Sequence, residues 1–166
     1  LQTEWPHLKI YLTSVTDHWA TTVLAGPKAR AVLEKICSDV NFDDAAFPFM
    51  SYRESTVAGV AARIMRISFS GELSYEVNVP ASQGLAVWEA IQAAGAEFGI
   101  TPYGTESMHV LRAEKGYIIV GQDTDGSMSP VDLGLGGMVA KTKDFLGKRS
   151  LSRSDTARTD RKQLVG

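Results

Sequence analysis

The sequence predicts an α+β fold, with helices packed on one face of a mainly antiparallel sheet. Short stretches alternate apolar and polar side chains, as strands do, while longer stretches repeat apolar side chains at helical spacing. Strands also follow one another before and after the first helix, whereas a doubly wound parallel sheet alternates strands with helices. These observations favour one layer of sheet covered by helices.

The first strands and the first helix lie within the first 40 residues. Residues 8–15 and 19–25 are rich in Leu, Ile, Tyr, Thr and Val, and predict two short strands around a turn near Thr16. Pro27 predicts a helix start, because its missing N–H would have no partner in the first helical position. A helical stripe follows at Ala29, Val32, Leu33, Ile36 and Cys37.

A β-hairpin is predicted over 61–80, after a loop at 41–48 and an extended stretch at 49–59. Apolar residues alternate with polar ones before and after a tight turn, at Met65, Ile67 and Phe69 and then at Tyr75, Val77 and Val79. Successive side chains leave opposite faces of a strand. Glu76 is therefore predicted to point away from the face that buries Tyr75, where it is free to meet a ligand.

Two further helices follow. The second begins at Ser82 as N-cap and ends before Gly99, with a stripe of Leu85, Trp88, Ile91, Gly95 and Phe98. The third covers Thr105–Glu114 and ends at Gly116. Beyond it we expect a long loop over 121–137, a short strand and helix within 139–151, and a polar linker over 152–162.

Composition and spacing exclude several functions. The 166 residues carry a formal net charge of −2, which gives no reason to expect nucleic acid. Cys37 is the only cysteine and the three histidines are scattered, so we expect no metal site. A single cysteine, no apolar run of membrane-spanning length and no signal peptide indicate a cytoplasmic protein without a membrane partner. A start without Met indicates a piece of a longer polypeptide.

Glu76 is the strongest candidate for a binding residue, together with Glu72 and Tyr75 beside it and the segment 103–116. A carboxylate on a sheet face can accept two parallel hydrogen bonds from the amino-pyrimidine edge of a pterin, at about 1.5–3 kcal/mol for each bond. On composition alone, the simpler interpretation is a solvated strand residue. For Arg112 and Glu114 the simpler interpretation is a local salt bridge near a helix end.

Four segments in order, at residues 25–29, 69–76, 111–116 and 129–136, resemble the folate-binding aminomethyltransferase family, typified by the glycine-cleavage T-protein. Within this family, the sequences of residues 71–79 and of the tail at 152–158 are most similar to the C-terminal part of heterotetrameric sarcosine oxidase α subunits. The resemblance implies a truncated aminomethyltransferase folate-binding fold. Residues 1–151 would form its central part, and 152–166 a linker and the start of a missing C-terminal β-barrel.

The resemblance also implies a function. Tetrahydrofolate would bind at Glu76, Tyr75, Tyr103 and Met108, where Met108 replaces an arginine of T-proteins, and the catalytic aspartate would lie upstream of Leu1. The module would convert the one-carbon unit of oxidised sarcosine to methylenetetrahydrofolate, with flavin and NAD elsewhere in a complex with other sarcosine oxidase subunits. The piece alone would be inactive.

Three alternatives stay open from the sequence. One is a free-standing aminomethyltransferase of the glycine cleavage system. Another is a non-catalytic folate-binding assembly protein, although that branch has Cys where this chain has Tyr117. The third is a plain interaction domain, which would have no concave polar pocket near Glu76.

Overall fold

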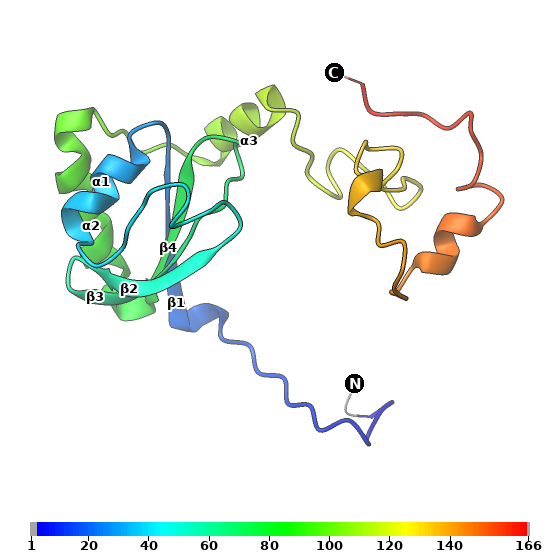
Figure 1. Cartoon of the computed structure of the whole chain (residues 1–166), viewed down its shortest axis with the longest axis horizontal. Helices are drawn as coiled ribbons and strands as arrows, with labels where there is room; N and C mark the ends of the chain where they lie inside the picture. Colours follow the sequence, from blue (N-terminus) through cyan, green and yellow to red (C-terminus); the bar gives the residue numbers. More distant parts are fainter. Residues whose placement is uncertain (1–2, 166) are drawn as a thin grey trace. The chain divides into compact units, whose positions relative to one another are not determined.

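A computed structural model describes residues 3–165 and divides them into two compact units, one up to Leu111 and one from Arg112 onward. The first unit holds a four-stranded antiparallel sheet in the order β1-β4-β3-β2 (Figure 1). Its strands are β1 (Trp19–Ala25), β2 (Tyr52–Val57), β3 (Val60–Met65) and β4 (Ser74–Pro80). The helices are α1 (Ala29–Ile36), α2 (Gly84–Gly95) and α3 (Thr105–Glu114). The predicted α+β class is confirmed.

Short 3-10 helices complete the secondary structure, at η1 (Thr16–His18), η2 (Ala81–Gln83), η3 (Ala96–Phe98), η4 (Gly136–Met138) and η5 (Lys148–Ser152). The turn predicted near Thr16 coincides with η1. Among residues 3–165, no helix has both the length and the apolar character needed to cross a bilayer.

The hydrophobic core lies between the sheet and the helices α1 and α2. The sheet contributes Leu24, Val57, Ala62, Ile64, Tyr75, Val77 and Val79, and the helices contribute Ala29, Val32, Leu33, Val87, Ile91 and Ala94. The loop before β2 adds Phe42 and Phe47, whose ring centroids lie 5.5 and 5.8 Å from that of Tyr75. These three aromatic rings close one end of the core.

Two glycines allow close approaches around β1. Gly26 adopts φ of 122°, a conformation that side chains rarely take, and its N–H donates to the Leu73 carbonyl at 2.8 Å. Gly84 lies so close to β1 that a Cβ on it would stand 2.6 Å from the Cβ of Ala20. The first glycine continues the β1–β4 pairing into the turn, and the second lets α2 pack on β1.

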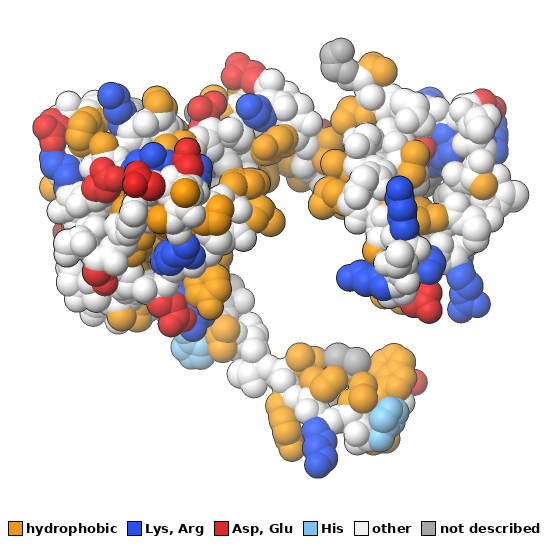
Figure 2. Space-filling model, in the orientation of Figure 1, with side chains coloured by type: hydrophobic (Ala, Val, Ile, Leu, Met, Phe, Trp, Pro, Cys, Tyr) orange, Lys and Arg blue, Asp and Glu red, His pale blue; other side chains and the backbone are white. Residues whose placement is uncertain are grey.

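The strand predicted over 8–15 is wrong. This segment contains no strand, and its side chains are largely exposed, with Tyr11 at 90% and Leu12 at 69% (Figure 2). A strand requires a neighbour with which to share backbone hydrogen bonds. No other strand of the described residues pairs with this segment, so strand-prone composition alone does not make it one.

The predicted hairpin over 61–80 has the right extent but the wrong turn. β3 ends at Met65, so Ile67 and Phe69 lie in an eight-residue connection and not in a strand. The tight hairpin joins β2 and β3 instead, through Ala58 and Gly59 at φ of 52° and 79°. Two consecutive positive φ values are required by a type I′ turn, which matches the twist of the flanking strands.

The apolar stripe predicted for α2 is rotated on the real helix. Val87, Ile91, Ala94 and Gly95 are buried, whereas Leu85 is 71% and Trp88 is 38% exposed.

Ser82 lies in η2, and α2 begins two residues later at Gly84. α1 likewise begins at Ala29, so Pro27 precedes the helix. The left-handed Gly99, at φ of 73°, and the bounds of α3 agree with the prediction.

The second unit is held together by charged contacts. Its described residues include no buried apolar side chain, and those buried are Arg112, Ser129 and Asp132. Figure 2 shows apolar side chains on the surface of this unit. Of the short strand and helix predicted within 139–151, the described structure has the 3-10 helix η5 but no strand. Arg112 pairs with Asp123 and donates to the Tyr117 carbonyl at 3.0 Å, which is the local role expected for it.

Asp132 is the centre of this unit. It accepts hydrogen bonds from Nη2 and Nε of Arg161, at 2.8 and 3.0 Å, and from the Ser129 N–H at 2.7 Å. The backbone of Asp132 also accepts from the Leu164 N–H at 2.8 Å. Asp132 thereby ties the segment around Ser129 to the segment around Arg161, which lies some 30 positions later in the chain. Arg161 is therefore not a freely solvated linker residue.

We expect the second unit to lose order as the pH falls below about 4. Bonding to Arg161, and then to the Ser129 N–H, holds the pKa of the Asp132 carboxyl well below its usual range. A depressed pKa stabilises the folded form above the unfolded value of about 3.9, and that contribution disappears as acid protonates the folded carboxylate. The Ser129 amide resonance, followed by NMR from pH 7 downward, checks this. Asp132→Asn is expected to weaken this pH dependence, and an unchanged pH profile in the variant would contradict the role of Asp132.

Candidate functional site

The face of the sheet away from α1 and α2 is the open face, formed by alternate residues of all four strands. One row of side chains crosses it in register. Val23 of β1 lies opposite Glu76 of β4, Glu76 opposite Met65 of β3, and Met65 opposite Tyr52 of β2. We call these four residues the Glu76 row. It places one carboxylate among apolar and aromatic side chains.

Glu76 itself is half-buried, and its parity is as predicted, because Tyr75 and Val77 on either side are fully buried. Within residues 3–165, no hydrogen bond or ion pair engages its carboxylate. A carboxylate with free acceptor positions, beside the apolar side chains of Val23 and Met65, suits a flat ligand with paired N–H donors along one edge. The apolar neighbours would contact the faces of such a ligand.

A second row of the open face is polar. Thr21 donates to the Asn78 side-chain oxygen at 2.6 Å, and Arg63 Nε lies 3.4 Å from Glu54. The Arg63 guanidinium also stacks over the Trp19 ring, 4.6 Å from its centroid. Register places Thr21, Asn78, Arg63 and Glu54 side by side across the sheet. The second row lies two residues away from the Glu76 row on each strand. Over that distance the side chains of the open face change from mainly apolar to polar and charged.

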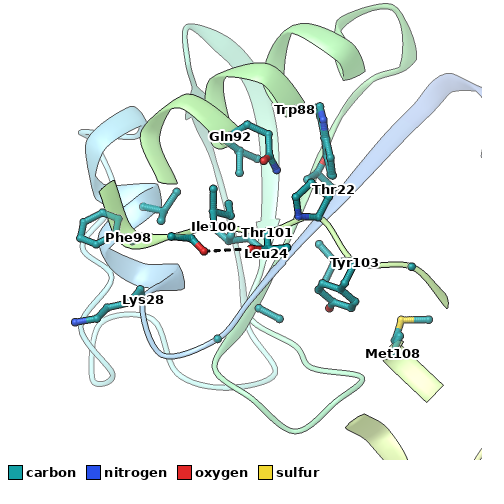
Figure 3. A pocket seen from close by; sticks show the side chains of 18 of the residues that line it. Thr22, Leu24, Lys28, Trp88, Gln92, Phe98, Ile100, Thr101, Tyr103 and Met108 are labelled. Atoms are coloured by element: carbon teal, nitrogen blue, oxygen red, sulfur yellow. Dashed lines mark hydrogen bonds between the residues drawn. The ribbon is translucent and has the colours of Figure 1, made fainter. Parts of the chain in front are cut away.

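A cavity of about 520 Å³ borders the free edge of β1 (Figure 3). Tyr103 and Met108 line it together with Trp88 and Phe98, and Val23 of the Glu76 row is also part of its wall. Thr101 also lines the cavity, and its hydroxyl donates to the Gly99 carbonyl at 3.3 Å (Figure 3). Val23 therefore connects the cavity to the carboxylate.

The structure places the four predicted site residues in three different settings. Tyr103 and Met108 line the cavity, and Glu76 lies beside it across Val23 without lining it. Tyr75 lies elsewhere, because its ring is completely buried against Phe42 and Phe47 on the covered face. Its placement is that of a core residue.

Sequence reasoning missed Val23, Met65 and Tyr52. The alternation of β4 placed Glu76 on the open face, but it could not say which residues lie across from it. That information is in the register, which requires knowing that β4 lies between β1 and β3. Once β1 and β4 are known to pair, the sequence points to Val23 as a neighbour of Glu76. Gly26 marks the end of the hydrogen-bonded β1–β4 ladder and so indicates its register.

An ion-pair network holds the connection that leads into β4. Arg66 donates to the Phe47 carbonyl at 2.6 Å and pairs with Asp44 at 2.8 Å. Bonding to Arg30, and the charge of Arg66, hold the pKa of the Asp44 carboxyl below its usual range. The loop carrying Phe47 is thereby fixed to the end of β3, next to the Glu76 row.

Two other kinds of chemistry find no support at this site. Cys37 is buried, and burial raises the pKa of its thiol, which disfavours the nucleophilic thiolate. Within the part of the chain that the structure describes, no three His, Cys, Asp or Glu side chains are grouped so as to hold a metal ion. The arrangement favours binding by a carboxylate.

Comparisons with known proteins find a family model and several relatives that match this chain. A model of the GCVT N-terminal domain matches residues 1–143. The sarcosine oxidase α subunit of Corynebacterium sp. strain U-96 is 57% identical over 99% of this chain and 17% of that protein. The α subunit of Rhizobium meliloti strain 1021 is 47% identical over the same shares, 99% and 17%. An aminomethyltransferase of Halothermothrix orenii is 36% identical over 91% of this chain and 42% of that protein.

The chain thus spans 17% of the length of the sarcosine oxidase subunits it matches. Among solved structures, the heterotetrameric sarcosine oxidase from Corynebacterium sp. U-96 in complex with pyrrole 2-carboxylate matches with a TM-score of 0.48. That match has 21% identity and covers 55% of this chain and 45% of the other.

Proposed function

We propose a function for this chain from one premise: it belongs to the GCVT N-terminal domain family. The chain is the folate-binding module of a sarcosine oxidase α subunit. It holds tetrahydrofolate where the one-carbon unit of oxidised sarcosine is transferred to form methylenetetrahydrofolate. The identity of 57% to a sarcosine oxidase α subunit, against 36% to an aminomethyltransferase, supports this choice within the family.

The observation that carries the proposal is the unpartnered, half-buried carboxylate of Glu76 in an apolar row. A pterin has a flat ring system and an amino-pyrimidine edge with adjacent N–H donors, so the acceptor carboxylate of the row fits it. Glu76 accepts two hydrogen bonds from that edge and fixes the in-plane orientation of the ring. Val23 and Met65 contact the ring on either side and exclude water from those bonds.

Orientation is the contribution of this chain to the reaction. Tetrahydrofolate, when bound, supplies the nitrogen nucleophile that accepts the one-carbon unit. Holding a reactant in one orientation converts a bimolecular encounter into an effectively unimolecular step. Tyr103 and Met108, in the cavity beyond Val23, contact the edge of the ring on that side. Tyr75 acts indirectly, by fixing the β4 backbone from the core side.

The rest of the reaction belongs to the parent complex. A flavin oxidises sarcosine elsewhere, NAD binds outside this chain, and other sarcosine oxidase subunits are the protein partners. The complex is cytoplasmic, in accordance with the single cysteine of this chain. A free-standing aminomethyltransferase is the second candidate, favoured by the Halothermothrix orenii relative. A dinucleotide-binding fingerprint upstream in the complete reading frame would select the oxidase.

We expect the 166-residue chain alone to be inactive and to bind tetrahydrofolate more weakly than micromolar. The open face covers a ligand from one side only, and affinity depends on preorganised contacts that enclose it. Anaerobic titration calorimetry of the chain and of the full-length subunit checks this. Tight binding by the full-length subunit with weak binding by the chain is expected. Micromolar binding by the chain would contradict the expectation that its open face is too little enclosed for tight binding. No binding by the full-length subunit would overturn the folate function.

A further inference from the structure

We propose that Arg63, stacked on Trp19, binds the carboxylate end of the folate while Glu76 binds the pterin end. This inference rests on the proposed function, since it assigns a second contact within the same site. It gives the open face two charged groups of opposite sign, which would fix both the position and the direction of the ligand along the strands.

The spacing along β1 fits a ligand with two different ends. Val23 marks the Glu76 row, and Trp19 stands four residues earlier on the same face. Four residues of antiparallel strand span about 13 Å at 3.4 Å each. Folate carries its flat heterocycle at one end and its glutamate carboxylates at the other, with an aminobenzoyl group between them. A ligand of that length, with its ring at Glu76, brings its anionic end to the Trp19 ring.

Arg63 is the cation available there. Strand residues on the open face are Trp19, Thr21, Val23, Ala25, Tyr52, Glu54, Thr56, Ala61, Arg63, Met65, Ser74, Glu76, Asn78 and Pro80, so Arg63 is the one basic side chain among the described strand positions of this face. The side chain is 49% exposed and therefore reachable. Its terminal guanidinium nitrogens form no hydrogen bond within residues 3–165. They can donate to a carboxylate in the bidentate manner typical of arginine.

The neighbours of Arg63 hold its guanidinium without satisfying it. Trp19 lies beneath the guanidinium plane at 4.6 Å, and this stacking fixes the plane while leaving its edge open. Glu54 approaches the Nε atom at 3.4 Å and is itself 67% exposed, so it is a weak competitor for an incoming carboxylate. Met108 lines the cavity without a charge, so Arg63 supplies the cation that the Met108 position does not.

The test uses two ligands and four variants of the full chain. Amide NMR titrations measure the affinity for tetrahydrofolate and for 6-methyltetrahydropterin, which has the ring but no aminobenzoylglutamate. Arg63→Gln is expected to weaken tetrahydrofolate binding about tenfold and to leave the tetrahydropterin unchanged, because one charged hydrogen-bonding pair is lost. Glu76→Gln is expected to weaken both ligands. Lys141→Gln removes an exposed cation outside the first unit and serves as the control.

The outcomes separate this inference from the proposed function. If Arg63→Gln leaves tetrahydrofolate unchanged, or weakens both ligands equally, while Glu76→Gln weakens both, then the assignment of Arg63 is overturned and the pterin site stands. If Glu76→Gln affects neither ligand, the proposed function fails. Arg63→Lys keeps the charge but loses the planar fork, so an affinity between those of wild type and Arg63→Gln is expected. Unchanged amide spectra of the free variants establish that each one is folded.

Discussion

Replacing Glu76 with glutamine weakens the binding of tetrahydrofolate roughly tenfold to a hundredfold. Glutamine has one acceptor oxygen and no charge, so one of two hydrogen bonds from the pterin edge is lost, at about 1.5–3 kcal/mol for a bond to a charged group. In the full-length subunit with its partners, sarcosine oxidation should continue at its normal rate. The one-carbon unit that no longer meets an oriented folate should then be released by hydrolysis as formaldehyde.

The matched control is Glu72→Gln, which removes the same charge from an exposed carboxylate four residues earlier, in the connection that leads into β4. Affinity and the ratio of methylenetetrahydrofolate to formaldehyde should be unaffected by it. Equal losses of affinity in the two variants would point to a general electrostatic effect and not to a contact at Glu76.

Replacing Tyr75 with alanine should have the largest effect on stability. The ring is completely buried and packs on Phe42 at 5.5 Å and Phe47 at 5.8 Å, so its removal leaves a cavity among three elements. Truncation of a buried aromatic side chain costs about 3–5 kcal/mol of the free energy of unfolding. Chemical denaturation of the full chain measures this loss directly.

Tyr75→Phe separates the core role of Tyr75 from a role in binding. The variant keeps the ring and its packing, so we expect a small change in the free energy of unfolding and no change in tetrahydrofolate affinity. Weaker binding by Tyr75→Phe, at unchanged stability, would show that the hydroxyl contacts the ligand. Tyr75 would then be a contact residue, as the family resemblance implies, despite its position on the covered face.

The parts of this fold that the sequence predicts well are those set by a local period. The bounds of β1, the parity of Glu76 and the left-handed Gly99 all follow from residues within a few positions of each other. The β2–β3 turn was missed because Ala58 takes a positive φ, which is rare outside glycine and asparagine. Local sequence gave no sign of that conformation.

The remaining errors concern which segments meet. Residues 8–15 have the composition of a strand, but pairing decides whether a strand forms, and nothing in the segment specifies a partner. The loop predicted over 41–48 is confirmed, but its sequence does not show that it folds over Tyr75 and that Phe42 and Phe47 fill the core. The site shows the same limit. Glu76 was identified alone, while its neighbours Val23 and Met65 come from strands that only the sheet order brings together.

The most direct test of the folate site is an amide NMR titration of the full chain with tetrahydrofolate under anaerobic conditions. We predict that the resonances that shift are those of Val23, Met65 and Glu76, together with Tyr103 in the adjoining cavity. Shifts confined to the other unit, for instance to the separate cavity near Met128 and Leu146, would contradict the account. So would the absence of any shift at Glu76 at saturating ligand.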